Sequence, residues 1–230
     1  MSKTAWIIFV SVIVLVFGGL VVYSRLNSPA ANVSSVDANA IIAASEDNGQ
    51  IADHTFGNVE SKVVLLEYGD FQCPSCGGAH AQIKAITEEY EDRIVFVFRN
   101  FPLTTIHPNA RAASAAAEAA GLQGKYWGMH DLLFEDQSAW SSQTATERTD
   151  TFAQYATTLG LNKDTFLTDI AGSPINKKIS FDQALGKKAG VDATPSFFLN
   201  GEKISDEVSS SIVQGDTSKL KALIDSKLTE

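Results

Sequence analysis

The chain has few cysteines and few basic residues, and both shortages exclude particular classes of protein. Only Cys73 and Cys76 are cysteines among 230 residues, so no framework of several disulfides holds the fold, and a chain of this length can bury a core without one. Lys3 and Arg25 are the only charged side chains in the first 25 residues, so the remainder carries 16 basic and 27 acidic side chains, a formal charge of −11 (16 − 27). This acidity argues against nucleic acid as a partner, because binding to it relies on clustered Lys and Arg.

Charge is absent altogether from residues 5–24, AWIIFVSVIVLVFGGLVVYS. At ~1.5 Å per residue this stretch spans ~30 Å, the hydrocarbon thickness of a bilayer, and Trp6 and Tyr23 lie at its ends, where aromatic rings favour the interface. The sequence therefore predicts an uncleaved membrane anchor over residues 1–25. Lys3 favours a cytoplasmic amino end, which makes the protein single-pass in the cell membrane with its catalytic domain extracytoplasmic. A cleaved signal peptide is the alternative, although its apolar core is usually shorter and SPAAN (28–32) is a poor cleavage site.

The rest of the chain is predicted to be a linker followed by one α/β domain. Residues 26–55 are rich in Ser, Ala, Asn and Asp and are typical of a tether. Within residues 56–230, the apolar runs at 62–70 and 94–101 predict buried strands, and a helical pattern lies between them. Strand, helix and strand in this order form a βαβ unit with parallel strands and a right-handed crossover.

A helical region of about residues 104–189 follows, opened by His107-Pro108 before an alanine-rich helix that Gly121 ends. SFFL (196–199), Asn200-Gly201 and EKI (202–204) predict a β-hairpin with a type I′ turn. The last helix begins near Asp216 and carries a leucine-rich face. Two strands from each end of the domain predict one mixed four-stranded sheet, with the helical region as an insertion.

The two cysteines form a Cys-Pro-Ser-Cys sequence where the first predicted strand meets its helix. With Pro74 at the first helical position, Cys73 lies at the helix N-terminus, where free N–H groups and the helix dipole stabilise a thiolate. Cys76 lies one turn on and can close a disulfide with Cys73. We therefore expect Cys73 to be the attacking thiol and Cys76 the inner, resolving thiol, with exchange through a mixed disulfide.

Three other roles for the pair remain open. Zinc would need two more ligands, and the four histidines (His54, His80, His107 and His130) show no paired spacing. A structural disulfide closing so short a loop would stabilise little. Inert reduced thiols do not suit an oxidising compartment. The βαβ setting favours a redox pair, and we expect neither a metal nor a cofactor.

Two further features lie near the thiols in the predicted fold. Glu67 interrupts the apolar run VVLLEYG six residues before Cys73. A carboxyl in a buried strand acquires a raised pKa and can exchange protons with a nearby thiol. The alternative is that Glu67 is an exposed acid at the end of the strand. Pro195 stands just before the strand SFFL, where proline is tolerated, and the backbone beside it can accept an extended peptide.

These residues resemble the thioredoxin superfamily and, within it, the DsbA/BdbD-like branch of thiol-disulfide oxidoreductases. The resemblance rests on CPSC after VVLLEYGDF, on Glu67 at the buried-acid position, and on Thr194-Pro195 before SFFL; NFPLTTIHPNARAASAAAEAA and GKYWGMHDLLFE are similar to the helical insertion of that branch. It implies a thioredoxin fold with Cys73 and Cys76 as the catalytic pair and Glu67 in proton transfer. It also implies that Pro195 is cis, with Thr194 helping to hold the substrate chain.

The resemblance further implies an enzyme that introduces disulfides into cysteine-containing exported proteins and is reoxidised by a membrane quinone-linked partner of DsbB or vitamin K epoxide reductase (VKOR) type. The Pro74-Ser75 pair departs from the Pro-His of the strongest oxidants, so we expect a potential below DsbA's ~−120 mV and above thioredoxin's ~−270 mV. A reductase or isomerase is the alternative direction. A binding or chaperone-like module is the alternative class, in which Cys73→Ala would keep activity.

Overall fold

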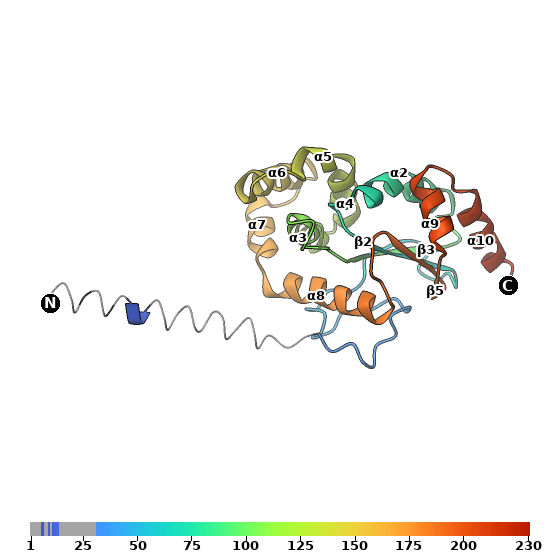
Figure 1. The fold of residues 1–230 in the computed structure, drawn as a ribbon, viewed down its shortest axis with the longest axis horizontal. Helices are drawn as coiled ribbons and strands as arrows, with labels where there is room; N and C mark the ends of the chain where they lie inside the picture. Colours follow the sequence, from blue (N-terminus) through green and yellow to red (C-terminus); the bar gives the residue numbers. More distant parts are fainter. Residues whose placement is uncertain (1–5, 7–8, 10, 14–30) are drawn as a thin grey trace. The chain divides into compact units, whose positions relative to one another are not determined.

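In the computed structural model, the described part of the chain comprises Trp6, Phe9, residues 11–13 and residues 31–230. The predicted anchor over residues 1–25 therefore lies almost wholly outside the described residues. No helix in the described part combines the length and the apolar content needed to cross a bilayer. Residues 31–230 cluster into one unit, whose ribbon is drawn in Figure 1.

A mixed sheet of five strands lies at the centre of this unit, in the order β1-β3-β2-β4-β5. The strands are β1 (Thr55–Gly57), β2 (Val64–Gly69), β3 (Val95–Asn100), β4 (Ser196–Leu199) and β5 (Glu202–Lys203). Only β2 and β3 pair in parallel, as the βαβ pattern predicts. The prediction of four strands was wrong, because the three-residue β1 is too short to show strand alternation and exists through its pairing with β3.

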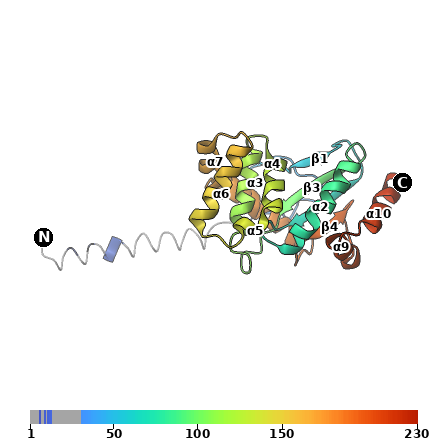
Figure 2. The same ribbon diagram turned by 90° about the horizontal axis from the view of Figure 1, so that it is seen from above.

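Helices cover both faces of the sheet (Figures 1 and 2). α2 (Pro74–Glu89) joins the two parallel strands, and α9 (Asp206–Val213) and α10 (Ser218–Leu228) follow the hairpin. The hairpin turn has positive φ at both Asn200 and Gly201, which suits the predicted type I′ turn. The predicted helical region contains α3 (Ala110–Gly121), α4 (Tyr126–Glu135), α5 (Gln137–Trp140), α6 (Ala145–Thr158), α7 (Lys163–Ile170) and α8 (Ser173–Lys188).

α3 is the inner helix of this region, and in Figure 1 it lies among α4, α6, α7 and α8. Seven of its alanines are buried, and such small side chains allow neighbouring helices to approach closely. The helix begins at Ala110, with Asn109 at the N-cap position and no side-chain capping hydrogen bond, rather than at the predicted Pro108. Pro108 instead lies in the connecting loop, two residues before the helix.

Successive side chains of β2 point to opposite faces of the sheet and so belong to two different layers of the core. Leu65 and Glu67 face the layer that contains α2, whereas Leu66 and Tyr68 face α8. Glu67 pairs in register with Phe98 on one side and Phe197 on the other, and it is 4% exposed. The central position of β2 therefore buries this carboxyl, and the alternative of an exposed strand-end acid was wrong.

Residues 31–55, predicted as part of a linker over 26–55, differ from a free tether. Arg99, buried on β3, donates hydrogen bonds to the backbone carbonyls of Ala38 and Ala40 and, at 2.7 Å, to the Asp53 carboxylate. Lys178 of α8 donates to the same carboxylate at 2.9 Å. The segment thus contributes one acid to a buried ion cluster beneath the sheet. Composition could not reveal this, since its partners lie 46 and 125 residues away.

Candidate active site around Cys73 and Cys76

The two cysteines lie at the start of α2, as the sequence predicts. Cys73 is the N-cap residue and Pro74 follows at the first helical position. Both thiols are free in this structure. Cys73 is 7% and Cys76 1% exposed, whereas Pro74 and Ser75 are exposed. A substrate can therefore reach the pair only from the side of Cys73.

The surroundings of Cys73 favour its thiolate. Hydrogen bonds from the Cys76 thiol, the Thr194 side chain and the backbone N–H groups of Cys76 and Ser75 outweigh burial and lower the pKa of Cys73 to about 5. The last two groups belong to the first turn of α2, whose N–H groups have no partner within the helix. At neutral pH Cys73 is therefore an anion and a good leaving group.

The loop before β4 completes the site from a distant part of the chain. The Thr194-Pro195 bond is cis, as the resemblance implies. The Cys73 thiol donates a hydrogen bond to the Thr194 carbonyl at 3.3 Å, and the buried Thr194 Oγ1 has no hydrogen-bond partner in this structure. That hydroxyl is thus free to donate to the thiolate form of Cys73.

A groove of about 310 Å³ adjoins this loop, between the start of α2 and α9. Ser75, Thr194 and Pro195 form one side of it. The other side comes from α9, through Asp206, Ser209, Ser210, Val213 and Gln214. The sequence analysis missed these α9 residues, because α9 is a short helix that was not predicted and only its packing against α2 brings it to the site.

Cys76 and Glu67 form the inner half of the site. Burial raises the pKa of Cys76 well above 9, and its hydrogen bond to Cys73 and the charge of Glu67 add to this effect. Burial, together with the Cys73 thiolate, raises the pKa of Glu67 to about 8. At neutral pH, Glu67 therefore carries a proton, and Cys76 holds its own.

Two side chains that the sequence analysis missed position the loop before α2. Gln137 of α5 donates to the carbonyls of Phe71 and Cys73 at 2.8 and 2.9 Å. The buried Asp70 accepts hydrogen bonds from the backbone N–H of Leu103 at 2.8 Å and from His107 at 2.8 Å. Polar residues of this kind occur throughout loops, so only their long-range contacts identify them.

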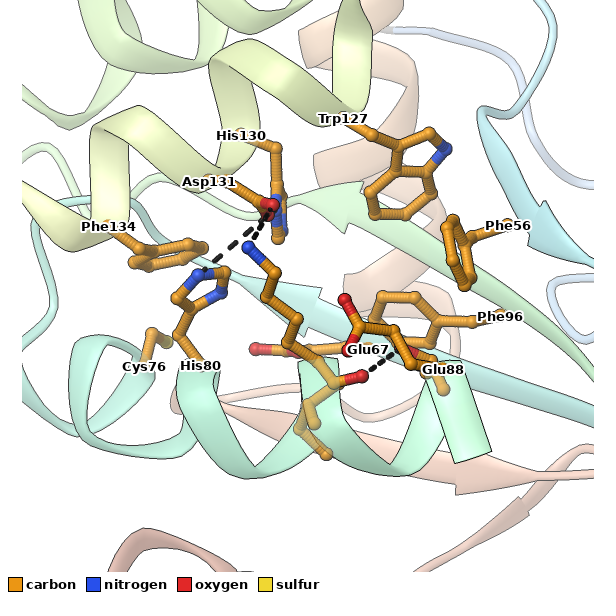
Figure 3. A pocket seen from close by; sticks show the side chains of 13 residues that line it. Phe56, Glu67, Cys76, His80, Glu88, Phe96, Trp127, His130, Asp131 and Phe134 are labelled. Carbon is orange, nitrogen blue, oxygen red and sulfur yellow. Dashed lines mark hydrogen bonds and ion pairs between the residues drawn. The ribbon is translucent and has the colours of Figure 1, made fainter. Parts of the chain in front are cut away.

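A cavity of about 50 Å³ lies behind the thiols, and Cys76, Glu67, His80 and His130 all contribute to its wall (Figure 3). His80 and His130 are buried, at 7% and 5% exposure, and their rings lie 5.3 Å apart. The spacing of the histidines along the chain therefore did not reveal that two of them lie side by side in the fold. Packing of α4 on α2 unites residues that are far apart in the chain.

Comparisons with known proteins agree with this fold. The sequence family described as Thioredoxin matches residues 49–219. Three similar crystal structures share the fold. BdbD from Bacillus subtilis has a TM-score of 0.66 and 21% identity, and the match covers 83% of this chain and 98% of BdbD. A thioredoxin-like oxidoreductase from Silicibacter pomeroyi has a TM-score of 0.62 and 24% identity, and the match covers 77% of this chain and 93% of that protein. Alpha-DsbA1 from Wolbachia pipientis has a TM-score of 0.63 and 22% identity, and the match covers 77% of this chain and 91% of that protein.

Curated relatives are similar to part of the chain. The Na(+)/H(+) antiporter NhaA 1 of Salinispora arenicola is 38% identical over 151 residues, which is 66% of this chain and 22% of the antiporter. The protein of the same name from Mycolicibacterium vanbaalenii is 35% identical over 153 residues, 65% of this chain and 23% of its own. The chain thus spans less than a quarter of the length of these relatives.

Proposed function

Because the chain belongs to the thioredoxin family, we propose that it is a thiol-disulfide oxidoreductase whose working pair is Cys73 and Cys76. The observation that carries this proposal is the contrast between the two thiols. Cys73 contacts Thr194, which lines the groove, and has a pKa of about 5, whereas Cys76 is buried with a pKa well above 9. One thiol is thus suited to leave as an anion and the other to end the exchange inside the protein.

Disulfide formation in a substrate would proceed in two exchanges. A substrate thiolate attacks Sγ of Cys73 in the oxidised enzyme, the Cys73–Cys76 bond breaks, and the electron pair goes to the sulfur of Cys76. Glu67, whose pKa burial raises, supplies the proton that this sulfur takes up and regains one from solvent. A second substrate thiolate then attacks the substrate sulfur of the mixed disulfide and releases Cys73 as a thiolate. The two substrate thiols release their protons to solvent when they become thiolates, and their two electrons reduce the Cys73–Cys76 disulfide.

The oxidising direction is part of the proposal. A low pKa of Cys73 stabilises the reduced enzyme relative to its disulfide, so it raises the reduction potential. Ser75 has only a hydroxyl to add to this stabilisation. A potential between those of thioredoxin and DsbA is therefore expected, in the range of ~−270 to ~−120 mV.

The groove and the apolar amino-terminal stretch support the proposed substrate class and the proposed location of the enzyme. The groove beside Pro195 is open to an extended peptide, and we propose that it receives cysteine-containing exported proteins. Residues 5–24 are long and apolar enough to anchor the chain in the cell membrane. An extracytoplasmic enzyme of this kind needs an electron acceptor, for which a membrane quinone-linked reoxidase of DsbB or VKOR type is the proposed partner.

The test is oxidation of a reduced two-cysteine peptide by the oxidised full-length chain in detergent. Cys73→Ser is expected to abolish oxidation. Cys76→Ser, given the oxidised peptide instead, is expected to accumulate a mixed disulfide between peptide and Cys73, seen on non-reducing gels, because Cys73 breaks the peptide disulfide and no Cys76 thiol remains to release it. Activity that survives Cys73→Ser would overturn the proposal in favour of a binding module, and a glutathione-equilibrated potential at or below ~−270 mV would favour the reductase direction.

A further inference from the structure

His80, His130 and Asp131 bring one donor atom each to within 4.8 Å of one another. His80 comes from α2, one helical turn after Cys76, and the other two come from α4. Figure 3 shows the three side chains directed toward a common point beside the cavity. From this juxtaposition we propose a binding site for a divalent transition-metal ion such as Zn²⁺, separate from the thiol chemistry.

The distances suit a metal of this kind. Oδ1 of Asp131 lies 3.1 Å from Nδ1 of His130 and 3.7 Å from Nε2 of His80. Tetrahedral Zn²⁺ with ligand bonds of ~2.0 Å places neighbouring donors ~3.3 Å apart, so both distances from Asp131 to the histidines lie close to the value that the metal requires. Two imidazoles and one carboxylate form a donor set that Zn²⁺ accepts, with a fourth position left for water.

An unsatisfied polar atom supports the site independently of these distances. Nε2 of His80 is buried and has no hydrogen-bond partner, although a buried polar atom normally finds one. The adjoining cavity of about 50 Å³ has room for a water, which would occupy the fourth metal position.

Lys84 is the group that opposes a cation here. Its ammonium lies 2.6 Å from Oδ2 of Asp131 and 3.1 Å from Glu135. Oδ1 of Asp131 faces the histidines, so Lys84 occupies the opposite oxygen of the carboxylate. Its positive charge should weaken metal binding, and Lys84→Gln should strengthen it. A purely structural histidine pair, packed among Phe134 and its neighbours, predicts no such gain.

The test measures Zn²⁺ uptake by the oxidised full-length chain in detergent, where the Cys73–Cys76 disulfide removes the thiols as ligands. Titration calorimetry is expected to show one saturable site. Asp131→Asn is expected to weaken it at least ~10-fold, His80→Gln to abolish it and Lys84→Gln to tighten it. His107→Gln is the matched control, because His107 also pairs with a carboxylate, Asp70, at 2.8 Å, and it should bind as wild type does.

Folding is checked by circular dichroism, and Asp131 is the safer position because its side chain is 27% exposed. Co²⁺ gives a second readout, since a tetrahedral site produces visible absorption that should vanish in the same variants. Wild-type protein that takes up no Zn²⁺ below ~1 mM, or uptake retained in both His80→Gln and Asp131→Asn, would overturn the proposal. Neither result bears on peptide oxidation, so the proposed function is judged separately.

Discussion

Replacing Thr194 by valine tests the electrostatic account of Cys73. Valine keeps the shape of the side chain and removes the hydroxyl, while the backbone carbonyl that lies 3.3 Å from the Cys73 sulfur stays in place. The Cys76 thiol and the N–H groups of the first turn of α2 also remain. The substitution therefore removes a single hydrogen bond to the thiolate from a set of four.

The expected size of the effect follows from the strength of that bond. A hydrogen bond to a charged group contributes ~1.5–3 kcal/mol, and one pKa unit corresponds to ~1.4 kcal/mol. The pKa of Cys73, about 5 in the wild type, should rise by ~1–2 units in Thr194→Val. At a pH above both values the reduced form loses the same free energy, which lowers the potential by ~30–60 mV for two electrons.

Thiolate absorbance near ~240 nm, followed from acid to neutral pH in the reduced protein, reports the pKa directly. Equilibration with glutathione buffers reports the potential. Ser209→Ala is the matched control, because Ser209 lies in the same groove and its hydroxyl donates to the Ser205 carbonyl rather than to a thiol. If Thr194→Val titrates within ~0.3 unit of the wild type, the hydroxyl does not stabilise the thiolate and this part of the mechanism fails.

Two further substitutions address the buried charges. In the reduced wild type, burial raises the pKa of Glu67 from 4.5 to about 8. Between these pH values the unfolded chain holds fewer protons than the folded one, so stability falls as pH rises. The pKa of Cys73 is lowered from 9 to about 5, so this residue makes stability rise with pH between those two values. Glu67→Gln should therefore gain stability relative to wild type from about pH 5 to about pH 8 in urea unfolding, and parallel pH profiles would contradict this. Asp53→Asn leaves Arg99 and Lys178 without their shared carboxylate and should lower the free energy of unfolding by about 3–5 kcal/mol, whereas a loss under ~1 kcal/mol would show that the cluster contributes little.

Local patterns in the sequence were sufficient for the catalytic helix and its neighbouring strands. The apolar runs of β2 and β3 and the helical pattern of α2 lie within the predicted ranges, because a strand buried on both faces and an amphipathic helix each leave a periodic signature. The turn at Asn200-Gly201 was also predictable from the sequence, since both residues tolerate the positive φ values that the hairpin requires. β1 and α9 escaped detection because three or eight residues carry too little periodicity.

The sequence by itself determined that two thiols three residues apart begin a helix, since this relation spans a single turn and follows from Pro74 and the free N–H groups of that turn. Only the tertiary structure decided what surrounds them. Thr194 reaches Cys73 across 121 residues, His80 meets His130 through the packing of α4 on α2, and Asp53 joins a cluster beneath the sheet. Such contacts depend on how elements pack, and no local pattern of residue types encodes which distant polar groups will share one buried space.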